Sequence, residues 1–293
     1  MDTLIKSVSS VLNAPSPHMV GDGFFVSNFF PGGYKIEMSP FYLLDFNAKM
    51  ELSASLEPKG VGAHPHRGFE TVTIAYHGAV AHQDSAGNKG IIYPGDVQWM
   101  TAARGILHKE YLEQEFSLTG GIFQMVQLWV NLPAKDKMST PKYQSIKNEE
   151  IGKFNLANAS GIIEVIAGEY QGVKGSATVF TDLHVYNAKI NEGGTAVFNF
   201  PAGFNTGFMV IEGSISINGH DTAKEGQFVH FQTGDGTEIQ VEATEKSVVL
   251  ILSGEPIDEP IAQYGPFLMN TKEEIRQAMD DYNRGCFGYL EAD

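Results

Sequence analysis

The stretch that decides the fold class is Gly121-Ile-Phe-Gln-Met-Val-Gln-Leu-Trp-Val130, an apolar run of strand length that is rich in β-branched and aromatic residues. Similar runs stand at Thr71-Val-Thr-Ile-Ala-Tyr76 and Ser247-Val-Val-Leu-Ile-Leu252. Such runs recur about every ten residues and are separated by Gly, Asn, Asp and Pro, which is typical of an all-β sandwich or barrel. The 32 glycines supply the turn positions with positive φ that such a fold requires.

A pattern of strands and glycine turns occurs twice along the chain. Ile74-Ala-Tyr-His-Gly78 is followed 17 residues later by Gly95, and Met209-Val-Ile-Glu-Gly213 is followed 13 residues later by Gly226. Because the same β-meander is used twice, we predict two antiparallel β-barrel domains. The 293 residues fit two domains of ordinary size. We place them at residues 1–135 and 136–293, near a polar connection over residues 133–141.

A short C-terminal helix is predicted after the second barrel. Thr271-Lys-Glu-Glu274 has the form of a capping box, and Gly285 ends the pattern. Apolar residues follow at helical spacing, which predicts that the helix packs on a barrel: Ile275, Ala278, Met279 and Tyr282.

Charge and composition exclude several classes of function. A formal net charge of -15 repels phosphate backbones and anionic membranes, so we expect no direct nucleic-acid or membrane binding. The start of the chain, Met1-Asp-Thr-Leu-Ile-Lys-Ser-Val8, lacks the features of a signal peptide, and Val248–Leu252 is too short to cross a bilayer. With Cys286 as the single cysteine, these features lead us to expect a cytoplasmic protein.

Two short segments carry residues that bind metals. His64-Pro-His-Arg-Gly-Phe-Glu70 and Arg104-Gly-Ile-Leu-His-Lys-Glu110 each contain two candidate ligands at positions i and i+2. On a strand this spacing puts both side chains on one face, so two strands would offer three imidazoles and a carboxylate to one ion. This donor set suits Fe(II), and also Ni, Mn, Cu or Zn. The alternative is that these histidines are surface residues or hydrogen-bonded core residues.

The second half of the repeat lacks these ligands. Counting from the matched glycines places Asn199 and Pro201 where the first half has its H-x-H pair, and Ile239 and Val241 where His108 and Glu110 stand. We therefore predict that the second domain is structural, and that His220 and His230 bind no metal.

The chain resembles the pirin family in long motifs. These are His64-Pro-His-Arg-Gly-Phe-Glu-Thr-Val-Thr73, Asp84-Ser-Ala-Gly-Asn-Lys-Gly90, Pro94-Gly-Asp-Val-Gln-Trp-Met-Thr101 with the stretch to Glu110, and Glu259-Pro-Ile-Ala-Gln-Tyr-Gly-Pro-Phe-Leu-Met-Asn270. The resemblance implies a bicupin fold, in which two antiparallel double-stranded β-helix barrels are joined and only one binds metal. It also implies that the metal ligands are His64, His66, His108 and Glu110. Glu70, where other cupins carry their carboxylate, is the rival fourth ligand.

The same resemblance implies an activity. Members of the family resemble quercetin 2,3-dioxygenases, which open the heterocyclic ring of a flavonol with O₂ and release CO. We therefore expect one divalent ion, with Fe(2+) as the first candidate, a small aromatic substrate and O₂ as partners, and Glu110 as the catalytic acceptor of the substrate's hydroxyl proton. Residues 95–100 and Phe123 either line an apolar pocket or fill the barrel.

Two other hypotheses stay open at this point. Some pirins are described as regulatory proteins, so the alternative is an iron-dependent, redox-sensing binding protein or co-regulator that contacts a protein partner. The other is a closed structural Zn site, which predicts loss of folding on chelation. We expect a monomer, because two barrels already pack within one chain.

Overall fold

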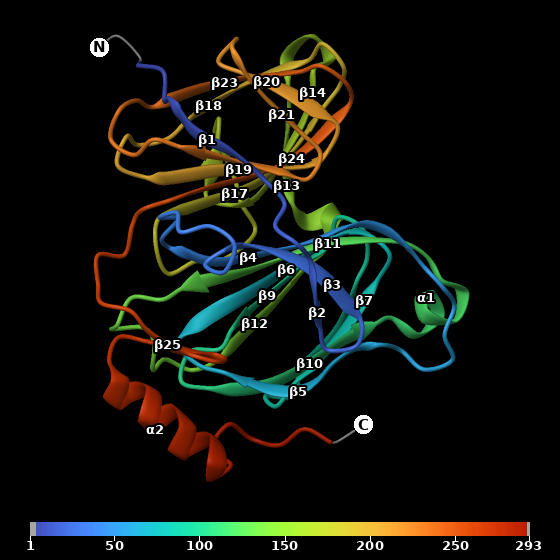
Figure 1. Cartoon of the computed structure of the whole chain (residues 1–293), viewed down its shortest axis with the longest axis vertical. Helices are drawn as coiled ribbons and strands as arrows, with labels where there is room; N and C mark the ends of the chain where they lie inside the picture. Colours follow the sequence, from blue (N-terminus) through green and yellow to red (C-terminus); the bar gives the residue numbers. More distant parts are fainter. Residues whose placement is uncertain (1–3, 292–293) are drawn as a thin grey trace. The chain divides into compact units, whose positions relative to one another are not determined.

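The computed structural model describes residues 4–291, which form two compact all-β units (Figure 1). The first unit comprises Ser16–Gly33, Phe41–Asn148 and the chain from Ile257 onward, and the second comprises the chain up to Pro15, Tyr34–Pro40 and Glu149–Pro256. Residues 1–3 and 292–293 lie outside the described part. The predictions for the start of the chain and for the outer ends of the two predicted domains fall in part on these residues.

The first unit contains two antiparallel sheets. The seven-stranded sheet has the order β12-β9-β6-β11-β4-β3-β2, and the four-stranded sheet has the order β5-β10-β7-β8. The strands are β2 (His18–Val20), β3 (Phe24–Phe30), β4 (Phe41–Leu52), β5 (Gly60–His66), β6 (Phe69–His77), β7 (Val80–Asp84), β8 (Lys89–Ile92), β9 (Val97–Thr101), β10 (Ile106–Leu112), β11 (Gly121–Asn131) and β12 (Lys142–Ile146), with the hairpin β25 (Ala262–Tyr264) and β26 (Phe267–Met269).

The second unit repeats this plan. Its seven-stranded sheet has the order β1-β22-β19-β24-β17-β14-β13, and its four-stranded sheet the order β18-β23-β20-β21. The strands are β1 (Val8–Asn13), β13 (Gly152–Asn155), β14 (Gly161–Ala167), β17 (Leu183–Ile190), β18 (Thr195–Asn199), β19 (Asn205–Glu212), β20 (Ser214–Ile217), β21 (Asp221–Lys224), β22 (Gln227–Phe231), β23 (Glu238–Ala243) and β24 (Ser247–Gly254), with the small pair β15 (Glu169–Tyr170) and β16 (Val173–Lys174).

The matching strand orders confirm the predicted repeat. The four glycines that marked it, Gly78, Gly95, Gly213 and Gly226, all have positive φ values between 77° and 91°. L-residues with a side chain rarely adopt this region of backbone space, so these turns require glycine. The repeat in the sequence therefore reflects the same turn geometry at equivalent points of the two units.

The units are assembled from distant segments. The chain passes from the first unit to the second between Asn148 and Glu149, 13 residues beyond the predicted boundary at 135/136. Strand β12 therefore still belongs to the first unit, where it pairs with β9. Strand β1 pairs with β22 of the second unit, whereas α2 belongs to the first unit. A single boundary does not describe this arrangement, because these pairings join residues that are far apart in the sequence.

Helices are short and few in the described chain: α1 (Gln114–Thr119), α2 (Lys272–Asn283) and the 3₁₀ turns Asn148–Glu150 and Ala157–Ala159. The predicted C-terminal helix is present with its capping box between Thr271 and Glu274. Ile275 and Ala278 are buried against Phe267 and Met269 of β26 and against Phe287. No helix among residues 4–291 is long and apolar enough to cross a membrane.

The polar connection after β11, residues 133–141, contains a fully buried lysine. Lys137 is 1% exposed, and its Nζ donates hydrogen bonds to the Gly68 carbonyl, to Asn131 Oδ1 and to the Leu268 carbonyl, at 2.7, 2.5 and 2.8 Å. One side chain therefore joins the turn before β6, the end of β11 and the hairpin strand β26.

Lys137→Met leaves these three buried acceptors without a donor, and such groups cost free energy when they are unpaired. We expect the free energy of unfolding to fall by about 3 kcal/mol, measured by chemical denaturation. Lys135→Met, at an exposed lysine two residues away, is the matched control and should change stability little. Equal effects of the two substitutions would contradict the role of Lys137.

A second buried ionisable group lies on β6. Glu70 is 1% exposed and accepts a hydrogen bond of 2.7 Å from Thr101 Oγ1 of β9. Burial raises the pKa of Glu70 from 4.5 to about 7, against the opposing effect of the Thr101 hydrogen bond. The folded carboxyl therefore keeps its proton at pH values where the unfolded one has lost it.

It follows that Glu70 lowers stability as the pH rises from 4.5 to about 7. Glu70→Gln removes this dependence. The free energy of unfolding of the variant, relative to that of the wild type, should therefore be about 3 kcal/mol higher at pH 8 than at pH 4. Denaturation curves at the two pH values measure the difference. Glu57→Gln, at an exposed carboxylate, should show no such pH-dependent gain, and a gain of equal size there would refute the assignment.

Candidate metal centre

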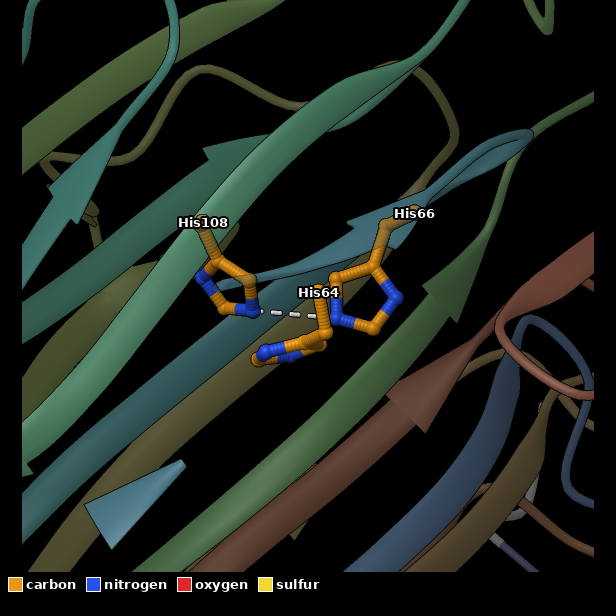
Figure 2. Close-up of side chains that lie close together, drawn as sticks. All are labelled: His64, His66 and His108. Carbon is orange, nitrogen blue, oxygen red and sulfur yellow. Dashed lines mark hydrogen bonds between the residues drawn. The ribbon is translucent and has the colours of Figure 1, made fainter. Parts of the chain in front are cut away.

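Strands β5 and β10 bring the three predicted histidine ligands together. The two strands are antiparallel, and His108 lies directly opposite His64. His66 lies two residues after His64, so its side chain is on the same face. The ligand nitrogens of the three rings all lie within 4.8 Å of one another (Figure 2). This is the one such cluster of His, Cys, Asp and Glu among residues 4–291.

The ring nitrogens of the three histidines meet in the centre of the cluster. His64 donates from Nδ1 to the Gly62 carbonyl at 2.8 Å, which leaves its Nε2 as the nitrogen available to a metal ion. The Nε2 atoms of His66 and His108 face each other at 3.0 Å, as the dashed line in Figure 2 marks. Burial lowers the pKa of both rings well below the usual range, and the neighbouring His64 lowers each further. Both imidazoles are therefore neutral bases at neutral pH.

These residues fit a divalent metal ion. Two imidazole nitrogens bound at about 2.1 Å in adjacent positions of an octahedral ion lie about 3.0 Å apart, the Nε2 separation of His66 and His108. Three imidazoles that converge, two of them buried and neutral, are a donor set for first-row divalent metals.

Glu110 lies beside the histidines, and its two oxygens are held by residues of two strands, β6 and β11, of the seven-stranded sheet. Its Oε2 is 3.9 Å from His108 Nε2 and accepts a hydrogen bond of 2.8 Å from Gln127 Nε2. Its Oε1 accepts a hydrogen bond of 3.1 Å from Thr73 Oγ1. Burial raises the pKa of Glu110, while His64 and these two hydrogen bonds oppose the rise. The carboxyl is thus oriented next to the imidazoles and is a better proton acceptor than an exposed carboxylate.

Glu70, the rival carboxylate, lies elsewhere. It is bonded to Thr101 and stands three residues before Thr73 on β6, so the two side chains point to opposite faces of the strand. The structure therefore brings Glu110, and not Glu70, next to the imidazole cluster.

A cavity of about 320 Å³ opens beside the cluster and includes His64, His66 and Glu110 in its wall. The rest of the wall is mainly apolar, from Val20, Phe24, Val26, Val61, Met125 and Trp129. Trp99, Met100 and Phe123 are fully buried and are not part of this wall, so they fill the barrel. Gly265 and Pro266, from the turn of the hairpin β25–β26, complete the lining.

The residue after His66 anchors the C-terminal segment. Arg67 Nη1 forms an ion pair of 2.9 Å with Asp281 Oδ2 of α2, and its Nε donates to the Arg104 carbonyl at 2.6 Å. Its guanidinium also lies 4.7 Å from the centre of the Phe287 ring. The chain beyond Ile257 is therefore attached to the strand end that carries His66.

The second unit has no equivalent cluster in its described residues. Ile239 and Val241 are buried, as predicted for the positions of His108 and Glu110. Asn199 and Pro201, however, are exposed, and Phe198 and Phe200 point into the core instead. Counting from the matched glycines therefore gave positions that are displaced by one residue, because the turns of the two units differ in length. A shift of one residue exchanges the two faces of a strand. His220 is exposed and hydrogen-bonded to the Asn218 carbonyl, and His230 contacts the Glu37 carbonyl.

Sequence reasoning missed Thr73 and Gln127. The signal was present, because Gln127 is a polar residue within the apolar stretch 121–130. A polar side chain at an inward-facing strand position needs a partner. The partner of Gln127 depends on how β11 pairs with β6, and this pairing cannot be predicted from the sequence of a single strand.

Two family patterns match the chain. The pirin family pattern matches residues 25–130, and the pattern of the pirin C-terminal cupin domain matches residues 185–288. A Pseudomonas aeruginosa protein named "Putative quercetin 2,3-dioxygenase PA2418" is 43% identical over 286 residues, covering 97% of this chain and 99% of that protein.

Solved structures give the same result. A crystal structure named quercetin 2,3-dioxygenase from Acinetobacter baumannii has a TM-score of 0.92 and 44% identity, covering 98% of this chain and 100% of that one. At the level of the fold alone, the Escherichia coli pirin YhhW in complex with nickel(II) has a TM-score of 0.65 and 22% identity, covering 85% and 99% of the two chains. The fold is thus a bicupin. With both cupin domains matched and 43% identity over nearly the whole length, this chain belongs to the pirin family.

Proposed function

We propose that the protein is a metal-dependent dioxygenase that opens the ring of a flavonol such as quercetin with O₂ and releases CO. The observation that carries the proposal is the convergence of three imidazoles, two of which, those of His64 and His66, line an apolar cavity of about 320 Å³. The names of the relatives PA2418 and the Acinetobacter baumannii enzyme support the same reaction.

In this proposal His64, His66, His108 and Glu110 hold the ion. Fe(2+) is the ion we propose, and Ni, Mn, Cu and Zn suit the same donors. When bound, the metal supplies Lewis acidity toward an oxygen ligand and a place where substrate and O₂ meet. Both histidines of the buried pair are ready to bind without first losing a proton, because burial keeps them neutral.

Glu110 accepts the proton of the flavonol hydroxyl that enters the cluster. Burial favours the protonated form of this carboxyl, which makes proton acceptance from a bound hydroxyl easier. Thr73 and Gln127 hold its two oxygens from two other strands, so the carboxyl keeps one orientation during the transfer. The apolar wall formed by Phe24, Met125 and Trp129 suits a flat aromatic ligand and excludes water.

Loss of a single imidazole should abolish both metal binding and turnover. We expect His66→Ala, prepared anaerobically, to contain less than a tenth of the iron of the wild type by elemental analysis. It should also show no oxygen-dependent loss of quercetin absorbance. His220→Ala, at an exposed histidine of the second unit, should retain both properties.

The same measurement separates the competing functions. One metal per chain with no turnover of any flavonol would move the proposal to a metal-dependent binding protein that contacts a protein partner. Wild-type protein without metal after reconstitution would refute the ligand set itself.

Gln127→Leu tests the support of Glu110. The substitution removes the donor to Glu110 Oε2 at similar volume, and loss of such an outer hydrogen bond weakens metal binding by about 10- to 100-fold. Competition with a chelator of known affinity measures the change in the dissociation constant. Gln83→Leu, at an exposed glutamine of β7, should leave it unchanged. An unaltered dissociation constant in Gln127→Leu would show that Glu110 does not depend on this contact.

A further inference from the structure

Polar side chains form a row across the inner face of the seven-stranded sheet of the first unit, and four of them lie on β3, β4, β11 and β6. Asn28 of β3 lies opposite Asp45 of β4, Asp45 lies opposite Gln127 of β11, and Gln127 lies opposite Thr73 of β6. Directly opposed residues of antiparallel strands point to the same face. From Thr73 and Gln127, which bind Glu110, the row therefore continues two strands further to Asp45 and Asn28.

Asp45 is the member of this row whose role the metal centre does not explain. Its side chain lines the same cavity as His64 and Glu110, although it contacts neither of them at hydrogen-bond distance. Among the described residues its one side-chain hydrogen bond is from Asn28 Nδ2 to Oδ1, at 2.7 Å. A carboxylate has about four acceptor positions on its two oxygens, so most of its capacity is left for a ligand.

The surroundings of Asp45 make a further donor favourable. The cavity wall next to it is apolar, with Phe24, Val26 and Met125, and burial raises the pKa of Asp45. The Asn28 hydrogen bond and the charge of His18 offset this only in part. A desolvated carboxyl with incomplete hydrogen bonding costs free energy, and a hydroxyl group of a bound ligand would recover part of that cost.

Asn28 holds the carboxyl in this position. Asn28 Oδ1 accepts a hydrogen bond of 2.7 Å from the Gly32 backbone amide, which directs its amide nitrogen toward Asp45. Both oxygens of Asp45 are thus restricted in direction before any ligand arrives. Such prior orientation is typical of a recognition group.

We propose that Asp45 is a specificity-determining residue that accepts a hydrogen bond from a second hydroxyl group of the aromatic substrate. This inference rests on the proposed dioxygenase function. Neighbouring strands are about 4.8 Å apart, and Asp45 lies one strand beyond Gln127, the residue bonded to Glu110. The site therefore selects polyhydroxylated flavonols, with one hydroxyl at the imidazole cluster and another on a different part of the ring system.

Two flavonols separate recognition from structure. Quercetin carries several hydroxyl groups, whereas 3-hydroxyflavone carries only the one that enters the metal centre. Iron-loaded wild type, Asp45→Ala and Asp45→Asn are titrated with each ligand by calorimetry without oxygen. Steady-state turnover with oxygen is then measured for the same pairs. Glu51→Gln, at an exposed carboxylate of the same strand, controls for the loss of charge.

For quercetin we expect the dissociation constant of Asp45→Ala to rise about tenfold or more, as for loss of a hydrogen bond to a charged group. Asp45→Asn, which keeps an acceptor oxygen and the side-chain volume, should lose less. For 3-hydroxyflavone both variants should stay within about twofold of the wild type, since no partner hydroxyl is lost. KM for quercetin should rise while kcat changes little, and Glu51→Gln should match the wild type for both ligands.

Equal weakening of both flavonols in the Asp45 variants would overturn the inference, because a structural role does not depend on the distant hydroxyl. Wild-type binding and turnover of both flavonols with no effect of either Asp45 substitution would also overturn it and leave the dioxygenase function intact. Failure of the iron-loaded wild type to bind either flavonol would overturn the proposed function and this inference together.

Discussion

Desolvation governs the interior of the first unit. The Nε2 atoms of His66 and His108 stand 3.0 Å apart in a buried place, and two charged imidazoliums at that distance would repel each other strongly. The rings are stable there only as neutral bases. Glu110 answers the same constraint by accepting hydrogen bonds from Thr73 and Gln127. These two hydrogen bonds are thus the condition on which a buried carboxylate can lie next to the imidazoles.

The second unit meets the constraint in the opposite way. It has the same strand order, but its core is filled with aromatic rings, among them Phe198, Phe200 and Phe208. Phe198 contacts Phe208 in a T-shaped arrangement with the ring centres 5.4 Å apart. In this interior the hydroxyls of Tyr170 and Tyr186 donate to backbone carbonyls, and its described residues offer no donor set for an ion. One architecture therefore carries a polar interior in one copy and an apolar interior in the other.

What the sequence predicted well depended on neighbours along the chain. The i, i+2 spacing of His64 and His66, the glycine turns at Gly78 and Gly213 and the capping box before α2 are all local patterns, and the structure contains each of them. The row from Thr73 to Asn28 could not be predicted, because it depends on the register of four strands. The same limit explains why the sequence count pointed to Asn199 and Pro201 instead of Phe198 and Phe200. It also explains the burial of Lys137, whose partners Gly68 and Leu268 are separated from it by 69 and 131 positions in the sequence.

The attachment of the C-terminal segment has a consequence for biosynthesis. Strands β5 and β10, which carry the imidazoles, leave the ribosome long before Pro266 and Asp281 are made. Until those residues arrive, Arg67 lacks its ion-pair partner and the cavity lacks the wall formed by the hairpin turn. The nascent chain thus has a period in which the histidines are present and more accessible to solvent. A metal ion that bound during translation and one that bound after release would therefore meet two different forms of the same site.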